Sequence, residues 1–167
     1  SARFSQIPSS QKSKPLPLKK KQTKPKLVVE ERKTQQTHIC LGTRGLSYKH
    51  PDRYVLGVMN VILGGNMSSR LFEEVREKRG LAYHISSSVH NFADAGIFLI
   101  SGGVDSRRIG NALKVIIGEM RKIRQKNVTK KEISQAKEFL RGQILLSMED
   151  TSHRMLWLGE NKLALGR

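Results

Sequence analysis

The period of the hydrophobic pattern changes once, abruptly, at Gly80, and this change limits the fold of the chain more than any other feature. Before the glycine, in "SSRLFEEVREKRG", apolar residues recur at helical spacing, with Leu71 and Val75 on one face. After it, in "LAYHISSSVHNF", the pattern alternates with a period of two, which is typical of a strand with one buried face. Glycine also suits the left-handed residue that ends many helices. The sequence therefore predicts a helix that turns directly into a strand.

The remaining elements follow from the same periodicity. Short runs rich in β-branched and aliphatic residues predict strands at 26–33 and 37–48, and "IFLISGGV" predicts the returning strand of a hairpin after the turn "NFADAG". Helical patterns are expected over four further ranges, 52–63, 105–123, 129–148 and 151–167. This order predicts an α+β fold with a mainly antiparallel sheet and helices packed on one face.

Individual residues add detail to these expectations. Asp105 is expected to cap a helix, and Thr129 with Glu132 fits a capping box, S/T-x-x-E. The inner face of the helix that follows is expected to carry Ile133, Ala136, Leu140 and Ile144. The single cysteine, Cys40, excludes an internal disulfide framework and is expected to be a small core residue. Trp157 is expected in the core or in an interface.

The formal net charge of +17 raises the question of a nucleic-acid partner, so its distribution matters. Residues 1–33 hold ten lysines and arginines against two glutamates, with three prolines between Lys12 and Lys26 and no aromatic residue among these lysines. Such a segment is typical of a solvated linker, whereas a single-strand binding platform needs aromatic residues between the cations. We therefore expect a basic flexible linker at 1–26 and a folded domain at 27–167, with a basic nucleic-acid-binding module as a weaker alternative.

The sequence also bears on the compartment. No run approaches about 18 apolar residues, and no apolar segment follows the N-terminal lysines, so neither a membrane span nor a secretory signal is expected. The lone thiol fits a reducing compartment. These observations predict either a cytoplasmic location or a targeting segment that lies outside this chain, and neither a membrane nor a nucleic-acid partner.

Residues that could carry chemistry by themselves are scarce. None of the five histidines forms the i, i+4 pair with a nearby glutamate that a helical zinc site needs. His84 and His90 lie on one face of the predicted strand, but about 20 Å apart at roughly 3.3 Å per residue, too far to share a metal ion. G-x-S-x-G and P-loop motifs are absent from the sequence. We therefore expect no catalytic residue, no metal site and no bound cofactor in this chain.

One long segment matches a family signature. "GGNMSSRLFEEVREKRGLAYHISSSVHNFADAGIFLISGGVD" closely resembles the pattern G-G-x-x-S-S-R-L-F-x-x-[LV]-R-E-x-x-G-L-A-Y of the insulinase, pitrilysin and mitochondrial-processing-peptidase group of zinc peptidases. The likeness extends more loosely over about residues 27 to 161. It implies the C-terminal, non-zinc domain of a bacterial-type member, a processing-peptidase-like or LuxS-metallohydrolase-like half-domain. In that family the inverted zinc motif H-x-x-E-H and a further glutamate ligand belong to the preceding domain, and neither is in this sequence.

The resemblance also implies two site residues. In bacterial relatives an arginine and a tyrosine, seven residues apart, contact the substrate backbone near the scissile bond, and Arg76 and Tyr83 match them. An arginine offers a charged fork of donors and a tyrosine hydroxyl offers a neutral donor, which suits peptide carbonyls. Without the resemblance, the pattern fits a second interpretation of each residue as well as it fits a substrate contact. Arg76 would then be a solvated or salt-bridged helix residue, and Tyr83 a core aromatic on the face of Ile85 and Val89.

The function implied by the resemblance is a non-catalytic, substrate-binding domain that closes the chamber of a zinc-dependent metalloendopeptidase acting on peptides or unfolded protein segments. Zinc would be bound by a catalytic domain in cis or in a partner subunit, so this chain alone is expected to be inactive. The resemblance also leaves open that two copies of the protein form a homodimer. The alternative is a non-catalytic partner subunit or a structural core-type subunit of the same family.

Two departures from the family pattern narrow the assignment. The non-catalytic α subunit of mitochondrial processing peptidase carries a long glycine-rich insertion, whereas only "GGN" precedes Met67 here. This difference argues against that subunit. Family members also continue beyond the helix that contains Trp157, so the domain is expected to be truncated at its C-terminal end.

Overall fold

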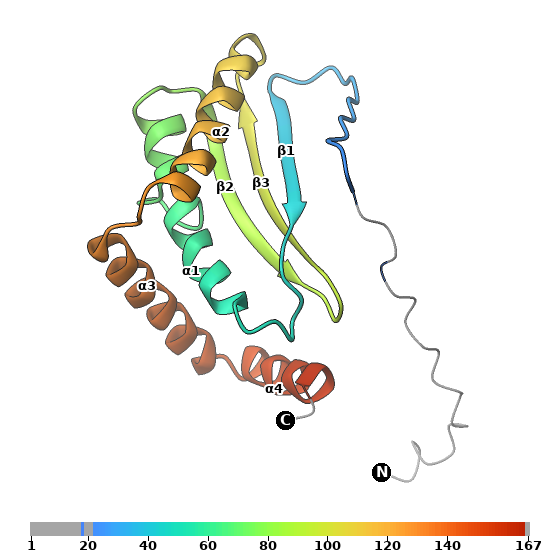
Figure 1. The fold of residues 1–167 in the computed structure, drawn as a ribbon, viewed down its shortest axis with the longest axis vertical. Coiled ribbons are helices and arrows are strands. Elements are labelled where there is room, and N and C mark those ends of the chain that lie inside the picture. The colour runs from blue at the N-terminus through green and yellow to red at the C-terminus, as the bar shows by residue number, and fades with distance from the viewer. Residues whose placement is uncertain (1–17, 19–21, 166–167) are drawn as a thin grey trace.

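The computed structural model describes residue 18 and residues 22–165, so most of the predicted linker at 1–26 lies outside the described residues. The elements in chain order (Figure 1) are β1 (Thr37–Arg44), α1 (Arg53–Leu63), the π-helical segment η1 (Phe72–Glu77), β2 (Ala82–Asn91), β3 (Gly96–Val104), the 3₁₀ turn η2 (Ser106–Arg108), α2 (Ile109–Gln125), α3 (Lys130–Glu149) and α4 (Thr151–Leu165).

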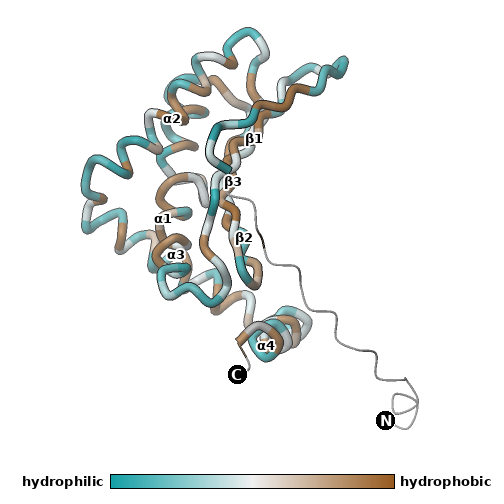
Figure 2. The backbone as a smooth tube through the Cα atoms, turned by 45° about the vertical axis from the view of Figure 1, so that its right-hand side comes forward, coloured by the Kyte–Doolittle hydropathy of each residue, from teal (hydrophilic) through white to brown (hydrophobic). Residues whose placement is uncertain are grey.

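The three strands form one antiparallel sheet in the order β1-β3-β2. Helices α1, α2 and α3 lie on the same side of this sheet (Figure 2). The core lies between the sheet and these helices, because the strands bury alternate residues toward them. Its buried apolar residues are Leu63, Leu71, Val75, Leu81, Ala82, Ile85, Phe98, Ile100, Val104, Ala112 and Ile116. The expected α+β fold, with an antiparallel sheet and helices on one face, is confirmed.

The strand expected at 26–33 is wrong. Residues 25–36 form neither helix nor strand, and Leu27, Val28 and Val29 are 85%, 76% and 79% exposed. A β-branched run becomes a strand only where a neighbouring strand accepts its backbone hydrogen bonds. The three strands of this sheet pair only among themselves in the part of the chain that the structure describes.

Two residues expected in the core, Cys40 and Ile144, are exposed, and so is Trp157. Cys40 lies on β1 between Ile39 and Leu41, and because these neighbours face the helices, the thiol points to the opposite face. Ile144 is 57% exposed, since only the first half of α3 packs on α1. Trp157, on α4, was expected in the core or in an interface; at 51% exposure it lies outside the core, and its place in an interface stays a prediction.

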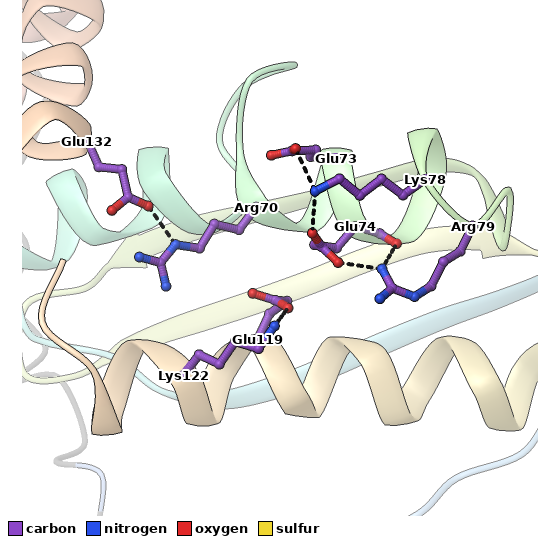
Figure 3. Close-up of polar contacts among 8 residues, drawn as sticks. All are labelled: Arg70, Glu73, Glu74, Lys78, Arg79, Glu119, Lys122 and Glu132. Atoms are coloured by element: carbon purple, nitrogen blue, oxygen red, sulfur yellow. Dashed lines mark hydrogen bonds and ion pairs between the residues drawn. The ribbon is translucent and has the colours of Figure 1, made fainter. Parts of the chain in front are cut away.

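The capping box at the start of α3 is confirmed, and it continues into an ion pair. The Glu132 carboxylate accepts hydrogen bonds from the backbone N–H and the hydroxyl of Thr129, both at 2.9 Å. It also accepts one from Arg70 Nε at 2.7 Å, which joins α3 to the segment before η1 (Figure 3). The Arg70 hydrogen bond is the main reason that the pKa of Glu132 is lowered to about 2.

Glu132→Gln is expected to lower the free energy of unfolding by about 1 kcal/mol at pH 7, because a half-buried ion pair and a helix cap are weakened together. Because folding lowers the pKa of Glu132, its carboxylate stabilises the fold at pH values above its pKa in the unfolded chain. This contribution is lost as the pH falls through about 2. The difference between wild type and variant should therefore shrink from pH 5 to pH 2. Urea unfolding at several pH values measures it, with the exposed Glu138→Gln as the control. A difference that stays constant down to pH 2 would contradict the assignment.

Candidate functional site

The site begins where η1 turns into β2. Gly80 has a φ of +55°, in the left-handed region that favours glycine, which confirms the expected helix-ending glycine. Its N–H donates to the Arg76 carbonyl at 3.0 Å, and the Leu81 N–H donates to the Val75 carbonyl at 2.8 Å. The expected α-helix is instead wound as a π-helix in its last turns, a form that often occurs at functional sites.

A β-bulge at the start of β2 sets the direction of Tyr83. Ala82 is opposite Val104 and His84 is opposite Gly103, so Tyr83 is the extra residue between them. The bulge places Ala82 in the core with Ile85 and leaves Tyr83 66% exposed. The expectation that Tyr83 shares a face with Ile85 is therefore wrong, because the bulge shifts the alternation by one residue. The interpretation of Tyr83 as an aromatic residue of the core is therefore wrong as well.

Arg76 lies at the end of η1 with its side chain 42% exposed. Its guanidinium is 4.6 Å from the centre of the Phe72 ring, and Nη1 is 3.8 Å from the Glu77 carboxylate. An ion pair this long and this exposed contributes little stability and occupies few donors. These contacts fit a solvated helix residue, and they also leave the guanidinium able to donate to a ligand.

Arg76 and Tyr83 line the same cleft, of about 290 Å³, together with Gly80, Leu81, Ala82 and Asp105. The Asp105 carboxylate accepts a hydrogen bond from the Arg107 N–H at 3.0 Å, as expected for a helix cap. The left-handed turn and the bulge thus bring both predicted site residues to one surface. A guanidinium fork and a phenol beside each other can donate to carbonyl oxygens of an extended peptide.

Two groups that sequence reasoning missed hold this turn. Arg108 donates to the carbonyl oxygens of Gly80, at 3.2 Å, and Arg79, at 3.0 Å. Its partners lie 28 and 29 residues earlier, so no local pattern signals the contact. The Glu74 carboxylate accepts from Lys78 at 2.8 Å and from Arg79 (Figure 3), and these hydrogen bonds lower the pKa of Glu74 to about 2. Glu74, Lys78 and Arg79 are therefore paired with one another.

The described residues do not fit a zinc site. Across residues 18 and 22–165, no three His, Cys, Asp or Glu side chains are grouped so that they could hold a metal ion. No helix in the same residues has the length and apolar content to cross a membrane.

The fold and the site define a class of protein, an α+β domain with helices on one face of an antiparallel sheet. At one end of the sheet this domain presents two hydrogen-bond donors, Arg76 and Tyr83, in one cleft. Its described residues include no cluster of metal ligands. Comparison with known proteins makes the class specific. The family model described as the peptidase M16 inactive domain matches residues 1–140, a range that includes the residues predicted as a linker. The chain belongs to the peptidase M16 inactive domain family.

Relatives in sequence and structure agree with this family. An uncharacterized zinc protease of Bacillus subtilis is 36% identical over 93% of this chain, and another of Streptomyces coelicolor is 42% identical over 81%. The matched residues cover only 38% and 29% of those two proteins. A conserved protein of Enterococcus faecalis superposes with a TM-score of 0.71 at 30% identity, covering 78% of this chain and 30% of its own. A peptidase M16 inactive domain from Pseudomonas fluorescens superposes with a TM-score of 0.62 at 32% identity, covering 65% and 27%.

Proposed function

We propose that this chain is the substrate-binding, non-catalytic domain of a zinc-dependent endopeptidase. In this role Arg76 and Tyr83 donate hydrogen bonds to the backbone of a peptide that lies in the cleft between η1 and β2. The observation that carries the proposal is the β-bulge, which turns the Tyr83 side chain out of the core and into the cleft that Arg76 lines.

The catalytic zinc would be held by a second domain, either in the same polypeptide or in a partner subunit. The relatives are named as zinc proteases, and they are more than twice as long as the matched segment. Both facts support an arrangement in cis. This domain would then cover the substrate from the side opposite the metal, and the chain alone would cleave nothing. A cytoplasmic location and assembly as a homodimer belong to the same proposal.

The alternative of a purely structural role within the same family predicts no function for an exposed tyrosine beside an exposed arginine, whereas a non-catalytic partner subunit can carry the same pair. β-bulges are over-represented next to active sites, where they re-aim a side chain. Exposure of Tyr83 and its place beside Arg76 therefore favour the substrate-binding role.

Tyr83→Phe tests this proposal in the full-length protein, because it removes one hydroxyl and leaves the ring. The loss of one neutral hydrogen bond, roughly 0.5–1.5 kcal/mol, should lower kcat/KM by about tenfold or less. Combined with Arg76→Ala, the loss should be less than additive, since both groups hold the same stretch of backbone. A double variant whose losses simply add, or a Tyr83→Phe enzyme with unchanged kcat/KM, would count against a shared substrate contact.

A further inference from the structure

A second pocket lies beside the candidate site, where the start of α2 packs against η1 and the turn that follows it. It has a volume of about 380 Å³, and we call it the basic pocket. Three cationic side chains and no carboxylate are among the described residues that line it. These residues are Arg79, Leu81, Arg108, Asn111, Lys114 and Val115.

Arg108 is held in the basic pocket by neutral partners. Its guanidinium donates to the carbonyl oxygens of Gly80, at 3.2 Å, and Arg79, at 3.0 Å. These hydrogen bonds occupy two of its five N–H donors, so three remain for a ligand. Because a carbonyl oxygen carries no net charge, the positive charge of Arg108 has no ion-pair partner among the described residues. The guanidinium is therefore fixed in position and still able to bind an anion.

Lys114 is the second cation without a counter-charge. It is exposed on α2, and no carboxylate in the described part of the chain forms an ion pair with it. Arg79 differs, because it is paired with Glu74, which lies outside the lining of the basic pocket (Figure 3). The pocket thus places two uncompensated cations, Arg108 and Lys114, around one volume, where an anion would reduce their mutual repulsion.

The basic pocket shares a wall with the cleft that Arg76 and Tyr83 line. Leu81 lines both. In addition, Arg108 of the basic pocket donates to the carbonyl oxygen of Gly80, which belongs to the lining of the cleft. A peptide that lies in the cleft can therefore place a group next to its bound backbone in the basic pocket.

We infer that the basic pocket is a specificity subsite for a carboxylate of the peptide substrate, either an acidic side chain or the free C-terminus. Arg108 and Lys114 bind the carboxylate, and the side-chain amide of Asn111 is a further donor in the same lining. The inference rests on the proposed function, since Arg76 and Tyr83 hold the backbone of the peptide that carries the carboxylate.

Quenched peptides that differ only by Glu or Gln, at each position around the scissile bond in turn, test the subsite in the full-length protein. At one position the Glu peptide should have the higher kcat/KM, by about three- to tenfold at low ionic strength and by less as salt screens the charges. A second pair ends in a free carboxylate or in an amide. A preference confined to this pair assigns the subsite to the C-terminus, whereas no preference in either set would contradict the inference.

Lys114 is the residue to vary, because Arg108 also holds the backbone of the turn. Lys114→Gln should reduce the preference to about twofold or less, and Lys114→Arg should retain it. Lys114→Glu should reverse it, so that the Gln peptide is cleaved faster than the Glu peptide.

Lys126→Gln is the matched control. Lys126 is an exposed lysine directly after α2, twelve residues beyond Lys114 and so about 18 Å along the helix at roughly 1.5 Å per residue. This variant loses the same charge and should retain the preference. A preference that survives Lys114→Gln and Lys114→Glu, or that is lost equally in Lys126→Gln, would overturn the subsite. Arg76→Ala should lower cleavage of both peptides equally, so unchanged cleavage in that variant points instead to failure of the proposed function.

A measurement without catalysis covers the case in which the enzyme cleaves neither peptide. Fluorescence anisotropy of labelled Glu and Gln peptides gives their Kd for the full-length protein after removal of the metal. The Glu peptide should bind about three- to tenfold more tightly, and Lys114→Gln should make the two Kd values nearly equal. Equal Kd values in the unsubstituted protein would contradict the inference.

Discussion

Arg76→Ala in the full-length protein is expected to lower kcat/KM by about ten- to a hundredfold while the fold and the metal content stay unchanged. Losing a hydrogen bond from a charged donor costs roughly 1.5–3 kcal/mol, and each 1.4 kcal/mol is about tenfold in rate. The side chain is 42% exposed and its closest ion pair, with Glu77, is 3.8 Å long, so its removal should cost little stability. Peptide hydrolysis at several substrate concentrations gives kcat and KM separately.

The matched control for this variant is Arg121→Ala, an exposed arginine on α2 that lies outside the lining of the cleft. It removes the same charge from the chain at a distance from the cleft and should leave kcat/KM within about twofold of wild type. If Arg76→Ala and Arg121→Ala behave alike, with equal melting temperatures, Arg76 is an ordinary solvated helix residue.

Leu71→Ala is expected to lower the free energy of unfolding of this chain by about 2–5 kcal/mol, because it leaves a cavity in the core. Leu71 is fully buried and belongs to the main cluster together with Val75, Ile100 and Ile116. It is also the residue directly before η1, so its packing fixes the segment that carries Arg76. Urea unfolding with an unchanged m-value measures the loss.

Leu163→Ala provides the control with the same chemistry. Leu163 is 91% exposed on α4, and its truncation should change the free energy of unfolding by no more than about 0.5 kcal/mol. Equal effects of the two substitutions would mean that the core does not lie where the sheet and helices place it.

Features of the fold that depend on local chemistry were predictable from the sequence. Gly80 ends η1 in the left-handed conformation, and Thr129 with Glu132 forms the capping box, because both signals act within one turn. The hairpin β2–β3 followed from alternation on both sides of a turn sequence. The strand expected at 26–33 was wrong because pairing depends on a neighbour that the run itself cannot specify. For Cys40, however, a signal existed: the alternation of Ile39 and Leu41 already assigns the thiol to the outer face.

The candidate site was predictable only in part. The resemblance to a peptidase family supplied Arg76 and Tyr83, and the structure places both in one cleft. The bulge that exposes Tyr83 could not be read from the sequence, because it arises from the register of β2 against β3. The same holds for Arg108, which reaches the turn from 28 residues away.

The most direct test of the account is a crystal structure of the full-length protein with a bound peptide, with cleavage prevented by removal of the metal. The account predicts peptide backbone in the cleft between η1 and β2, with the Arg76 guanidinium and the Tyr83 hydroxyl each within about 3.2 Å of a backbone carbonyl oxygen. A peptide that is bound in the chamber but contacts neither Arg76 nor Tyr83 would contradict it.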